Sequence, residues 1–296
     1  MQIEKFKGTG VALVTPFTKD GKIDFNSLEK VIENCISGKA DYLVSLGTTG
    51  ESVTLSKAEK SEVLAFTIEK VAGRKAVVVG CGGNNTQAVV EELKTLPKGV
   101  DGVLSVSPYY NKPNQNGIYA HYAHIAKSTS LSVILYNVPS RTGSNMTADT
   151  TLRLSEDFKN IIGIKEASGN IDQISEILSK RRPDFLVISG DDALTFPLLS
   201  LGIDGVISVV ANAYPYLFSE MLRKTTSGKN KEAQQIHFRL APIIELLFAD
   251  GSPGGIKELL SYFKLTENNL RLPLWPVNEE VKKSIVKFAS ENPDRF

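Results

Sequence analysis

A lysine that ends an apolar run is the residue whose type and position first suggest chemistry in this chain. Residues 161–164 have the length and composition of a strand buried on both faces, and Lys165 follows them directly. Burial disfavours the ammonium form of a lysine and favours the neutral amine, which attacks carbonyl carbon. The position of Lys165 therefore indicates Schiff-base chemistry.

Lys165 also has a simpler explanation. A lysine at the end of a strand commonly extends its charged end into solvent or pairs with a carboxylate, and Glu166 is the next residue. On this stretch alone the simpler explanation is the more common one. The choice between the two depends on polar residues elsewhere in the chain.

Polar side chains follow other apolar runs, at the points where strands are expected to end. They are Thr48, Thr49, Tyr109, Tyr110, Tyr136, Asn137 and Arg141. Each is ambiguous by itself, because threonines stabilise glycine turns and strand tyrosines usually pack in a core. In a barrel of parallel strands, however, all the carboxyl ends meet at the rim that carries active sites. Their shared placement predicts proton carriers and a carboxylate binder around the lysine.

Eight short apolar runs, with helix-length amphipathic segments between most of them, would position these residues. The runs cover residues 10–17, 42–47, 76–81, 102–107, 132–138, 161–165, 185–189 and 205–210. Such alternation predicts parallel strands joined by right-handed crossovers. Eight units within about 220 residues predict an α/β fold, a closed (β/α)8 TIM barrel, and the alternative is an open doubly wound sheet.

The glycine turns favour the barrel over the open sheet. No dinucleotide-binding glycine fingerprint follows the first strand, where a doubly wound fold would carry it, and no P-loop pattern occurs. The Gly-Cys-Gly-Gly segment at residues 80–83 lacks the spacing of that fingerprint, so we interpret it as a tight turn that allows close backbone approach. We therefore expect no cofactor.

Strand patterns stop after about Gly228, and three helical segments follow at residues 231–248, 253–263 and 278–290. The sequence thus predicts a barrel with the active site at residues 1–228 and a C-terminal three-helix region, a helical appendage, at residues 229–296. No long linker rich in proline and glycine separates them, so we expect the appendage to pack on its own barrel or on a neighbouring copy.

Composition excludes several classes of function. The 296 residues are 42% hydrophobic and 23% charged, and 34 Lys+Arg against 33 Asp+Glu leave a net charge of +1, so no nucleic-acid partner is expected. The N-terminus lacks an apolar export segment and no run of about 18 apolar residues occurs, so no membrane association is expected. The expected partner is a small molecule.

Cysteines and histidines give no sign of a metal or a disulfide. Cys35 and Cys81 lack metal-ligand spacing, and we expect both to be buried thiols of a cytoplasmic protein. His121 and His124 share a helix face without a third ligand, and His237 also stands in a helical context. We expect no metal.

Several motifs resemble a known superfamily. They are Gly-Thr-Thr-Gly-Glu at 47–51, Pro-Tyr-Tyr-Asn-Lys-Pro at 108–113, Tyr-Asn-Val-Pro-Ser-Arg-Thr-Gly at 136–143, Gly-Ile-Lys-Glu at 163–166 and Gly-Asp-Asp at 190–192. The chain resembles the dihydrodipicolinate synthase and N-acetylneuraminate lyase superfamily from Gly10 to the C-terminus. Residues 140–143 are similar to the synthase members, since the sialic-acid lyases differ at this point.

The resemblance implies a reaction and a site. Pyruvate would condense with Lys165, lose a methyl proton to give an enamine, and attack the aldehyde of aspartate 4-semialdehyde, the first committed step toward diaminopimelate and lysine. Tyr136, Thr49 and a Tyr110 donated by a neighbouring subunit would form a proton relay. The resemblance also implies substrate-binding residues. Thr48 and Thr49 would bind the carboxylate of pyruvate, and Arg141 would bind a carboxylate of the semialdehyde. Gly190 and Ile207 would flank the bound pyruvate.

A shared Tyr110 implies a homo-oligomer, in this superfamily commonly a tetramer built as a dimer of dimers. Two other functions remain open at this point. One is another pyruvate-dependent aldolase of the superfamily, similar to N-acetylneuraminate lyase. The other is a non-catalytic barrel that binds a keto acid, although such a protein would not need the complete relay.

The resemblance also implies a candidate effector cleft for lysine at the tight-dimer interface. Three residues match it: Ser52, Asn84 and Tyr109. Ala88, however, replaces the acidic partner of the effector's amino group, and Lys57 and Lys60 replace histidines. We expect weak or absent inhibition by lysine unless Glu91 or Glu92, one turn along, substitutes for that partner.

Overall fold

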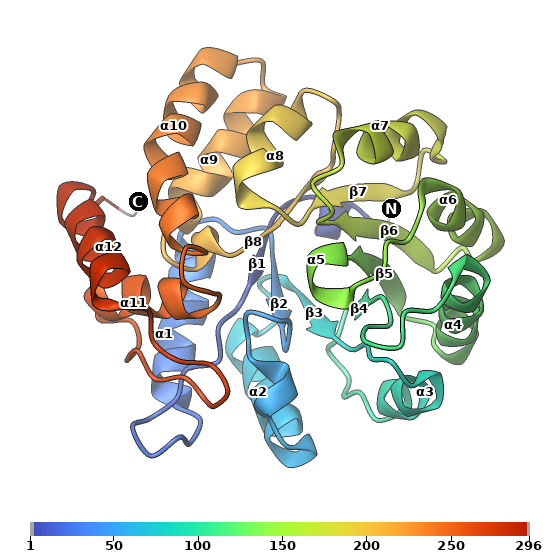
Figure 1. Ribbon diagram of the computed structural model, residues 1–296, viewed down its shortest axis with the longest axis horizontal. Coiled ribbons are helices and arrows are strands. Elements are labelled where there is room, and N and C mark those ends of the chain that lie inside the picture. The colour runs from blue at the N-terminus through green and yellow to red at the C-terminus, as the bar shows by residue number, and fades with distance from the viewer. Residues whose placement is uncertain (1–2, 295–296) are drawn as a thin grey trace.

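Eight parallel strands close into a barrel in the order of the chain in the computed structural model, which describes residues 3–294 (Figure 1). The strands are β1 (Gly8–Ala12), β2 (Tyr42–Ser45), β3 (Ala76–Gly80), β4 (Gly102–Val106), β5 (Ser132–Asn137), β6 (Ile161–Glu166), β7 (Leu186–Ser189) and β8 (Gly205–Ser208). β1 pairs with both β2 and β8, which closes the sheet. The predicted (β/α)8 barrel is confirmed, and the open sheet is wrong.

A ring of helices covers the outside of the barrel (Figure 1). The main helices of the ring are α1 (Phe25–Ser37), α2 (Lys57–Val71), α3 (Thr86–Lys94), α4 (Gln115–Ser128), α6 (Ala148–Asp157), α7 (Ile171–Lys180), α8 (Asp192–Leu199) and α9 (Pro215–Thr226). Four short helical turns also occur: η1 (Glu4–Phe6), η2 (Ser52–Thr54), α5 (Pro139–Thr142) and η3 (Val210–Asn212).

Side-chain caps explain where the first two of these helices begin. Asp24 accepts a hydrogen bond from the backbone N–H of Ser27 and starts α1. Ser56 and Glu59 form a capping box at the start of α2, in which each side chain accepts from the backbone N–H of the other residue. These caps satisfy backbone N–H groups in the first turns of α1 and α2.

Three further helices follow the barrel, drawn in orange and red in Figure 1. They are α10 (Asn230–Leu246), α11 (Gly254–Tyr262) and α12 (Glu279–Glu291), close to the predicted segments. α10 packs against α8, α9 and α12, and α11 contacts η3. On α12, Ile285 and Ala289 are buried. The division of the chain at residue 228 stays a prediction.

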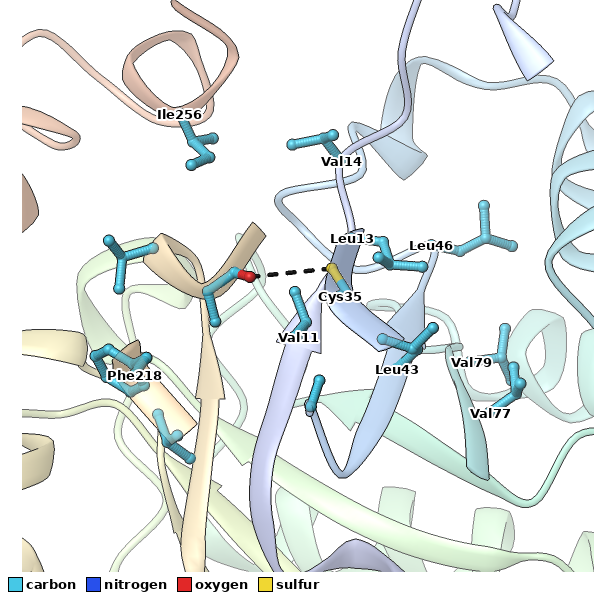
Figure 2. Packing of buried hydrophobic residues seen from close by; sticks show 14 of the residues in the cluster. Val11, Leu13, Val14, Cys35, Leu43, Leu46, Val77, Val79, Phe218 and Ile256 are labelled. Carbon is cyan, nitrogen blue, oxygen red and sulfur yellow. Dashed lines mark hydrogen bonds between the residues drawn. The ribbon is translucent and has the colours of Figure 1, made fainter. Parts of the chain in front are cut away.

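Two apolar layers form because successive side chains of a strand point to opposite faces. Val11 and Leu43 face the helices, in the layer that Figure 2 shows around Cys35. Ala12 and Val44 face the barrel interior. Cys35 is buried and its thiol lies 3.9 Å from the carbonyl oxygen of Ala211, and burial raises the pKa of this thiol. The expected buried thiol is confirmed.

The first strand is shorter than the sequence predicts. The apolar run continues to Phe17, but β1 ends at Ala12. Beyond that residue, the side chain of Asn212 takes the place of a strand partner: its Nδ2 donates to the carbonyl of Ala12 at 2.8 Å, and its Oδ1 accepts from the N–H of Val14 at 3.2 Å. Backbone groups paired with a side chain no longer need a neighbouring strand.

The amino ends of the strands are held together by aspartates. Three aspartates that precede strands accept the backbone N–H of a residue in the adjacent strand. These contacts join Asp41 to Thr9 at 2.7 Å, Asp101 to Val77 at 2.9 Å and Asp204 to Val187 at 2.9 Å. Polar groups at this end are therefore engaged in closing the barrel, which leaves the opposite end for a site.

Candidate active site

A cavity of about 620 Å³ opens at the carboxyl ends of the strands, and six of the predicted site residues line it. They are Thr48, Thr49, Tyr136, Arg141, Lys165 and Gly190. They come from the turns or strand ends of β2, β5, β6 and β7, so the barrel brings together residues that are far apart in the sequence. The C-terminal part of the chain adds Glu245, Phe248 and Ser252 to the wall.

Lys165 lies near the end of β6 and is 7% exposed. Its Nζ lies 4.5 Å from the ring centroid of Tyr136, which is its register partner on β5. Among the ion pairs of residues 3–294, none includes Lys165. This amine is therefore buried, faces the cavity and has no carboxylate partner within ion-pair distance among the described residues.

Glu166 is not the partner of Lys165, because successive residues of β6 point to opposite faces. Its carboxylate accepts hydrogen bonds from Nε2 of Gln173 at 2.8 Å, the N–H of Ser168 at 2.8 Å and Nδ2 of Asn137 at 3.1 Å. Both parts of the simpler explanation for Lys165, exposure to solvent and pairing with Glu166, are therefore wrong.

Gly190 packs against the stem of the lysine. A Cβ atom at this position would lie 3.0 Å from Cε of Lys165 and 2.6 Å from Cβ of Ala167, closer than such atoms approach one another. Glycine is thus required for Lys165 to extend into the cavity. The resemblance implies a position for Gly190 beside bound pyruvate, and in the structure Gly190 also lies close to the side chain of Lys165.

The turn after β2 holds Thr48 and Thr49 at the cavity wall. Glycine hydrogen bonds close the turn, with the N–H of Gly50 donating to the carbonyl of Gly47 at 3.1 Å. The hydroxyl of Thr15 donates to the carbonyl of Gly50 at 2.6 Å and ties the turn to the chain after β1. Thr49 is 6% exposed and lines the cavity, so it is shielded from bulk solvent.

The Gly-Cys-Gly-Gly segment at the end of β3 packs against the backbone at the start of that turn. A Cβ atom on Gly80 would lie 2.3 Å from the carbonyl oxygen of Leu46, and one on Gly82 would lie 2.6 Å from the backbone nitrogen of Val106. The predicted close backbone approach is confirmed, and it occurs on both sides of β3.

Arg141 lies on α5, the short helical turn after β5, and its side chain is exposed at the rim. It lines the main cavity, a second cavity beside it and a third near residues 248–254 and 270–276. No ion pair among residues 3–294 includes it. A guanidinium without a carboxylate partner at a cavity mouth is available for an anionic ligand.

Two predicted site residues lie outside the main cavity. Tyr110 is 88% exposed and has φ of 72°, an unusual conformation for a bulky residue. Ile207 is 1% exposed in the apolar core inside the barrel, together with Tyr136, Val44 and Ile188. Within one chain, Tyr110 therefore does not meet Lys165, and Ile207 packs below the cavity floor rather than lining it.

Asp192 is a cavity residue that the sequence reasoning did not single out. It is 3% exposed, and Oδ2 accepts from the backbone N–H of Val210 at 2.8 Å and of Val209 at 3.0 Å. Burial raises the pKa of Asp192 to about 6, and these hydrogen bonds oppose the shift. Its presence in the Gly-Asp-Asp motif was the available signal, whereas Glu245 on α10 carries no comparable signal.

A second cavity of about 490 Å³ shares a wall with the first and contains much of the candidate effector cleft. Ser52 and Tyr109 line it, and Asn84 lies beside it with its side-chain amide donating to the carbonyl of Tyr109 at 3.2 Å. Its charged groups are Arg141, Lys60 and Glu92, of which the last two form an ion pair at 3.8 Å.

Cys81, the other expected buried thiol, also lines this second cavity. Burial, with a smaller contribution from the nearby carboxylate of Glu92, raises the pKa of its thiol to about 12. A thiol with so high a pKa is not a nucleophile near neutral pH.

His121, one of the histidines considered as a metal ligand, is buried and hydrogen-bonded in the structure. The Nδ1 of His121 hydrogen-bonds with the hydroxyl of Thr86 at 2.9 Å, and burial lowers the pKa of this histidine to about 4. Within residues 3–294, no three His, Cys, Asp or Glu side chains are grouped so that they could hold a metal ion. Every helix of the described chain is too short or too polar to cross a membrane.

The (β/α)8 barrel, with its site at the carboxyl ends of the strands, has the architecture of the barrel lyases. The chain belongs to the dihydrodipicolinate synthetase family, whose model matches residues 5–292. The superfamily expected from the motifs is thus confirmed over nearly the whole length.

Individual relatives agree with this assignment. The chain is 50% identical to the 4-hydroxy-tetrahydrodipicolinate synthase of Parabacteroides distasonis over 271 residues, which are 91% of each chain. It is 47% identical to the enzyme of that name from Porphyromonas gingivalis over 297 aligned positions that cover 100% of both. The crystal structure of dihydrodipicolinate synthase from Thermotoga maritima superimposes with a TM-score of 0.94 at 40% identity, covering 96% of this chain and 98% of that one.

Proposed function

We propose that this protein condenses pyruvate with aspartate 4-semialdehyde to 4-hydroxy-tetrahydrodipicolinate, the first committed step toward diaminopimelate and lysine. The observation that carries the proposal is Lys165, buried, unpaired and facing a cavity in a chain of this family. An amine in this position attacks the keto carbon of pyruvate, and loss of water gives the imine.

The imine makes a methyl proton of the bound pyruvate acidic, and its removal gives an enamine. The enamine carbon then attacks the aldehyde carbon of the semialdehyde, whose oxygen takes up a proton. Finally, the amino group of the semialdehyde attacks the imine carbon, which closes the ring and releases Lys165 as the free amine. The reaction needs proton carriers beside the amine and no redox cofactor.

Tyr136 and Thr49 are the proposed proton carriers in the chain that holds the lysine. The ring of Tyr136 lies against the lysine amine, and Thr49 lies on the wall of the same cavity. We assign the third hydroxyl to Tyr110 of a neighbouring copy. Its 88% exposure and its left-handed backbone support this role, because an exposed tyrosine with a strained backbone requires a functional reason.

A Tyr110 shared between copies requires a homo-oligomer, and we propose a tetramer built as a dimer of dimers. One solved structure similar to this chain is described as the first monomeric dihydrodipicolinate synthase variant, with a TM-score of 0.95 and 40% identity, covering 97% of each chain. Assembly is therefore a property to measure for this chain. We also propose a cytoplasmic location, which agrees with the two free, buried cysteines.

The substrate carboxylates have separate proposed partners. Thr48 and Thr49 would hold the carboxylate of pyruvate through hydroxyls and turn amides, beside the amine of Lys165. Arg141 would bind a carboxylate of the semialdehyde at the rim, where its guanidinium is free of ion pairs. Gly190 and Ile207 would limit the space around the pyruvate carbons, Gly190 from the wall and Ile207 from below.

Trapping the imine tests the proposal directly. Incubation with pyruvate and borohydride is expected to add one three-carbon fragment to the chain, located on Lys165 by peptide mass spectrometry. Lys257 serves as an internal control because it is also buried but is paired with a carboxylate, and it should stay unlabelled. Label on another lysine, or no label, would contradict the proposed mechanism.

A comparison of acceptors separates this activity from its alternatives. Aspartate 4-semialdehyde should be turned over in preference to N-acetylmannosamine, because Arg141 offers a binding partner for a carboxylate. A preference for the sugar would support an aldolase similar to N-acetylneuraminate lyase. Background turnover of both acceptors by folded protein that still forms the pyruvate adduct would support a barrel that only binds keto acids.

A further inference from the structure

The turn that carries Thr48 and Thr49 ends at Glu51, whose backbone is in the left-handed region with φ of 51°. The N–H of Glu51 donates to the carbonyl of Thr48 at 3.1 Å and closes the turn. Its own carbonyl accepts from the N–H of Thr54 at 3.0 Å and from the hydroxyl of the same residue at 2.9 Å. The position of Glu51 and the position of the turn are therefore coupled.

The side chain of Glu51 contacts the C-terminal part of the chain. Its carboxylate forms an ion pair with Lys257 of α11, and both side chains are fully buried. Its second oxygen accepts the backbone N–H of Arg271 at 3.1 Å. A carboxylate buried in this way is fixed by its partners, because moving away from them would leave its charge uncompensated.

Lys257 pairs with Glu51 and is closed off from the cavities. Its Nζ also donates to the carbonyl of Asn269 at 2.8 Å and lies 4.3 Å from the ring centroid of Phe17. Burial lowers the pKa of Lys257 to about 8, although the charge of Glu51 opposes the shift. The residue lines none of the three cavities described above, so it has no access to a substrate.

Arg271 extends the same cluster to the start of α2. Its guanidinium binds both oxygens of Glu59 at 2.9 and 2.5 Å, and it donates to the carbonyls of Gly21 at 2.7 Å and Thr54 at 3.0 Å. The segment after α11 thus lies against α2, as Figure 1 shows. Through Arg271, the C-terminal segment therefore binds Thr54, in the loop that follows the turn, as well as Glu51.

We propose that Glu51 is a positioning residue, whose buried ion pair with Lys257 holds the Thr48–Thr49 turn in the geometry that binds the pyruvate carboxylate. The inference rests on the proposed function, because it takes pyruvate as the ligand of this turn. It gives the C-terminal helical part a task in catalysis, since α11 acts on the site through Glu51. A small displacement of a group that orients a reactant lowers the reaction rate by a large factor.

Two variants test the proposal. Lys257→Met removes the cation and leaves Glu51 unpaired. The double variant Glu51→Gln with Lys257→Met removes both charges, so it contains no uncompensated buried charge and should fold even where the single variant does not. Arg181→Met is the matched control, because Arg181 pairs with Asp204 at the opposite end of the barrel.

The measurement is the pyruvate concentration that gives half-maximal borohydride trapping on Lys165, together with the KM values for both substrates. In both test variants, the half-saturating pyruvate concentration and the KM for pyruvate should rise about tenfold or more. The KM for the semialdehyde should stay within about twofold, because Arg141 is on α5 and outside the cluster. The control variant should lose stability without a change in pyruvate saturation.

The outcomes separate this inference from the proposed function. Absence of trapping in the unmodified protein would overturn the proposed function and the inference with it. Normal trapping in the unmodified protein, with an unchanged half-saturating pyruvate concentration in either folded test variant, would overturn the positioning role alone. An equal rise of both KM values, or a rise in the Arg181→Met control, would show general destabilisation and also overturn it.

Discussion

Two buried lysines of this protein have opposite surroundings. Lys165 ends a barrel strand, contacts the ring of Tyr136 and opens onto a cavity without an ion-pair partner. Lys257 lies on a helix outside the barrel, is fully buried and is paired with Glu51. Burial alone therefore does not make a lysine reactive. A reactive lysine must also reach a carbonyl substrate, and the cavity gives that access to Lys165 but not to Lys257, which lines none of the three cavities.

Substitution of Lys165 should give the largest effect and the clearest separation of the two lysines. We expect Lys165→Met to lower kcat by about a thousandfold or more, because the covalent intermediate can no longer form. The free energy of unfolding should be unchanged or higher, since the substitution removes a polar group buried without a charged partner. Turnover assays and denaturant unfolding of the same preparation measure both quantities.

An inactive but less stable Lys165→Met protein would break this comparison, because it would show that the lysine also supports the fold. Lys165→Arg provides a charged control. The guanidinium stays protonated and does not form the imine, so this variant should be as inactive as the methionine variant.

Substitution of Lys257 should give the second largest effect, on stability. Lys257→Met leaves the carboxylate of Glu51 buried without its cation, and breaking such a pair typically costs about 3–5 kcal/mol of unfolding free energy. The double variant with Glu51→Gln should recover much of this loss because no charge remains. Denaturant midpoints of the single and double variants measure the difference. Equal stability of the two would show that charge compensation is not the role of this pair.

The same two lysines show what could be predicted from the sequence. Lys165 was found because a charged residue at the end of an apolar run conflicts with its surroundings, and because the strand pattern places that residue at the rim. The eight strands were found for the same reason, since parallel strands buried on both faces form continuous apolar runs. The signal for each strand lay within a few consecutive residues, whereas the chemistry assigned to Lys165 also depended on the polar residues that end the other apolar runs.

Lys257 was not found, because a lysine in a helix segment normally extends into solvent. Its burial depends on Glu51, on Asn269 and on the ring of Phe17, which come from distant parts of the chain. The early end of β1 was missed for a similar reason, since Asn212 supplies the competing hydrogen bonds. Contacts made only in the folded protein leave no local pattern to detect.

A smaller effect is expected at the partly exposed ion pair of the same cluster, between Arg271 and Glu59. Hydrogen bonds from Arg271 and from the backbone of Ser56 lower the pKa of Glu59 from 4.5 to about 2. Because the folded-state pKa lies below the unfolded value, the carboxylate stabilises the fold fully above about pH 4.5, and this contribution is lost as the pH falls toward 2.

Glu59→Gln tests this dependence. The variant should be less stable than the unmodified protein by about 1–3 kcal/mol near neutral pH. The difference between the two melting temperatures should shrink as the pH is lowered from about 6 to about 3. A difference that stays constant over this range would show that the charge of Glu59 does not contribute, and that the loss comes from packing.

The smallest effect is expected on the rate when free lysine is added as an inhibitor. The ion pair between Lys60 and Glu92 in the second cavity decides how well such a ligand can bind. Glu92 faces the second cavity and could substitute for the acidic partner that Ala88 lacks, whereas Glu91 points elsewhere and binds Gln87 and Lys94. Glu92 is, however, already paired with Lys60, so a lysine ligand would have to displace that cation.

Loss of one charge-assisted hydrogen bond typically costs about 1.5–3 kcal/mol, roughly ten- to more than a hundredfold in affinity. Lys60 would also repel a cationic ligand directly. We therefore expect initial rates to stay unchanged across a lysine titration up to roughly millimolar concentrations. Ala88→Glu combined with Lys60→His should introduce sensitivity, because it supplies the missing carboxylate and frees Glu92. Half-maximal inhibition of the unmodified protein at micromolar lysine would show that Lys60 and Ala88 do not disable the cleft, and that a paired carboxylate can still recruit a ligand.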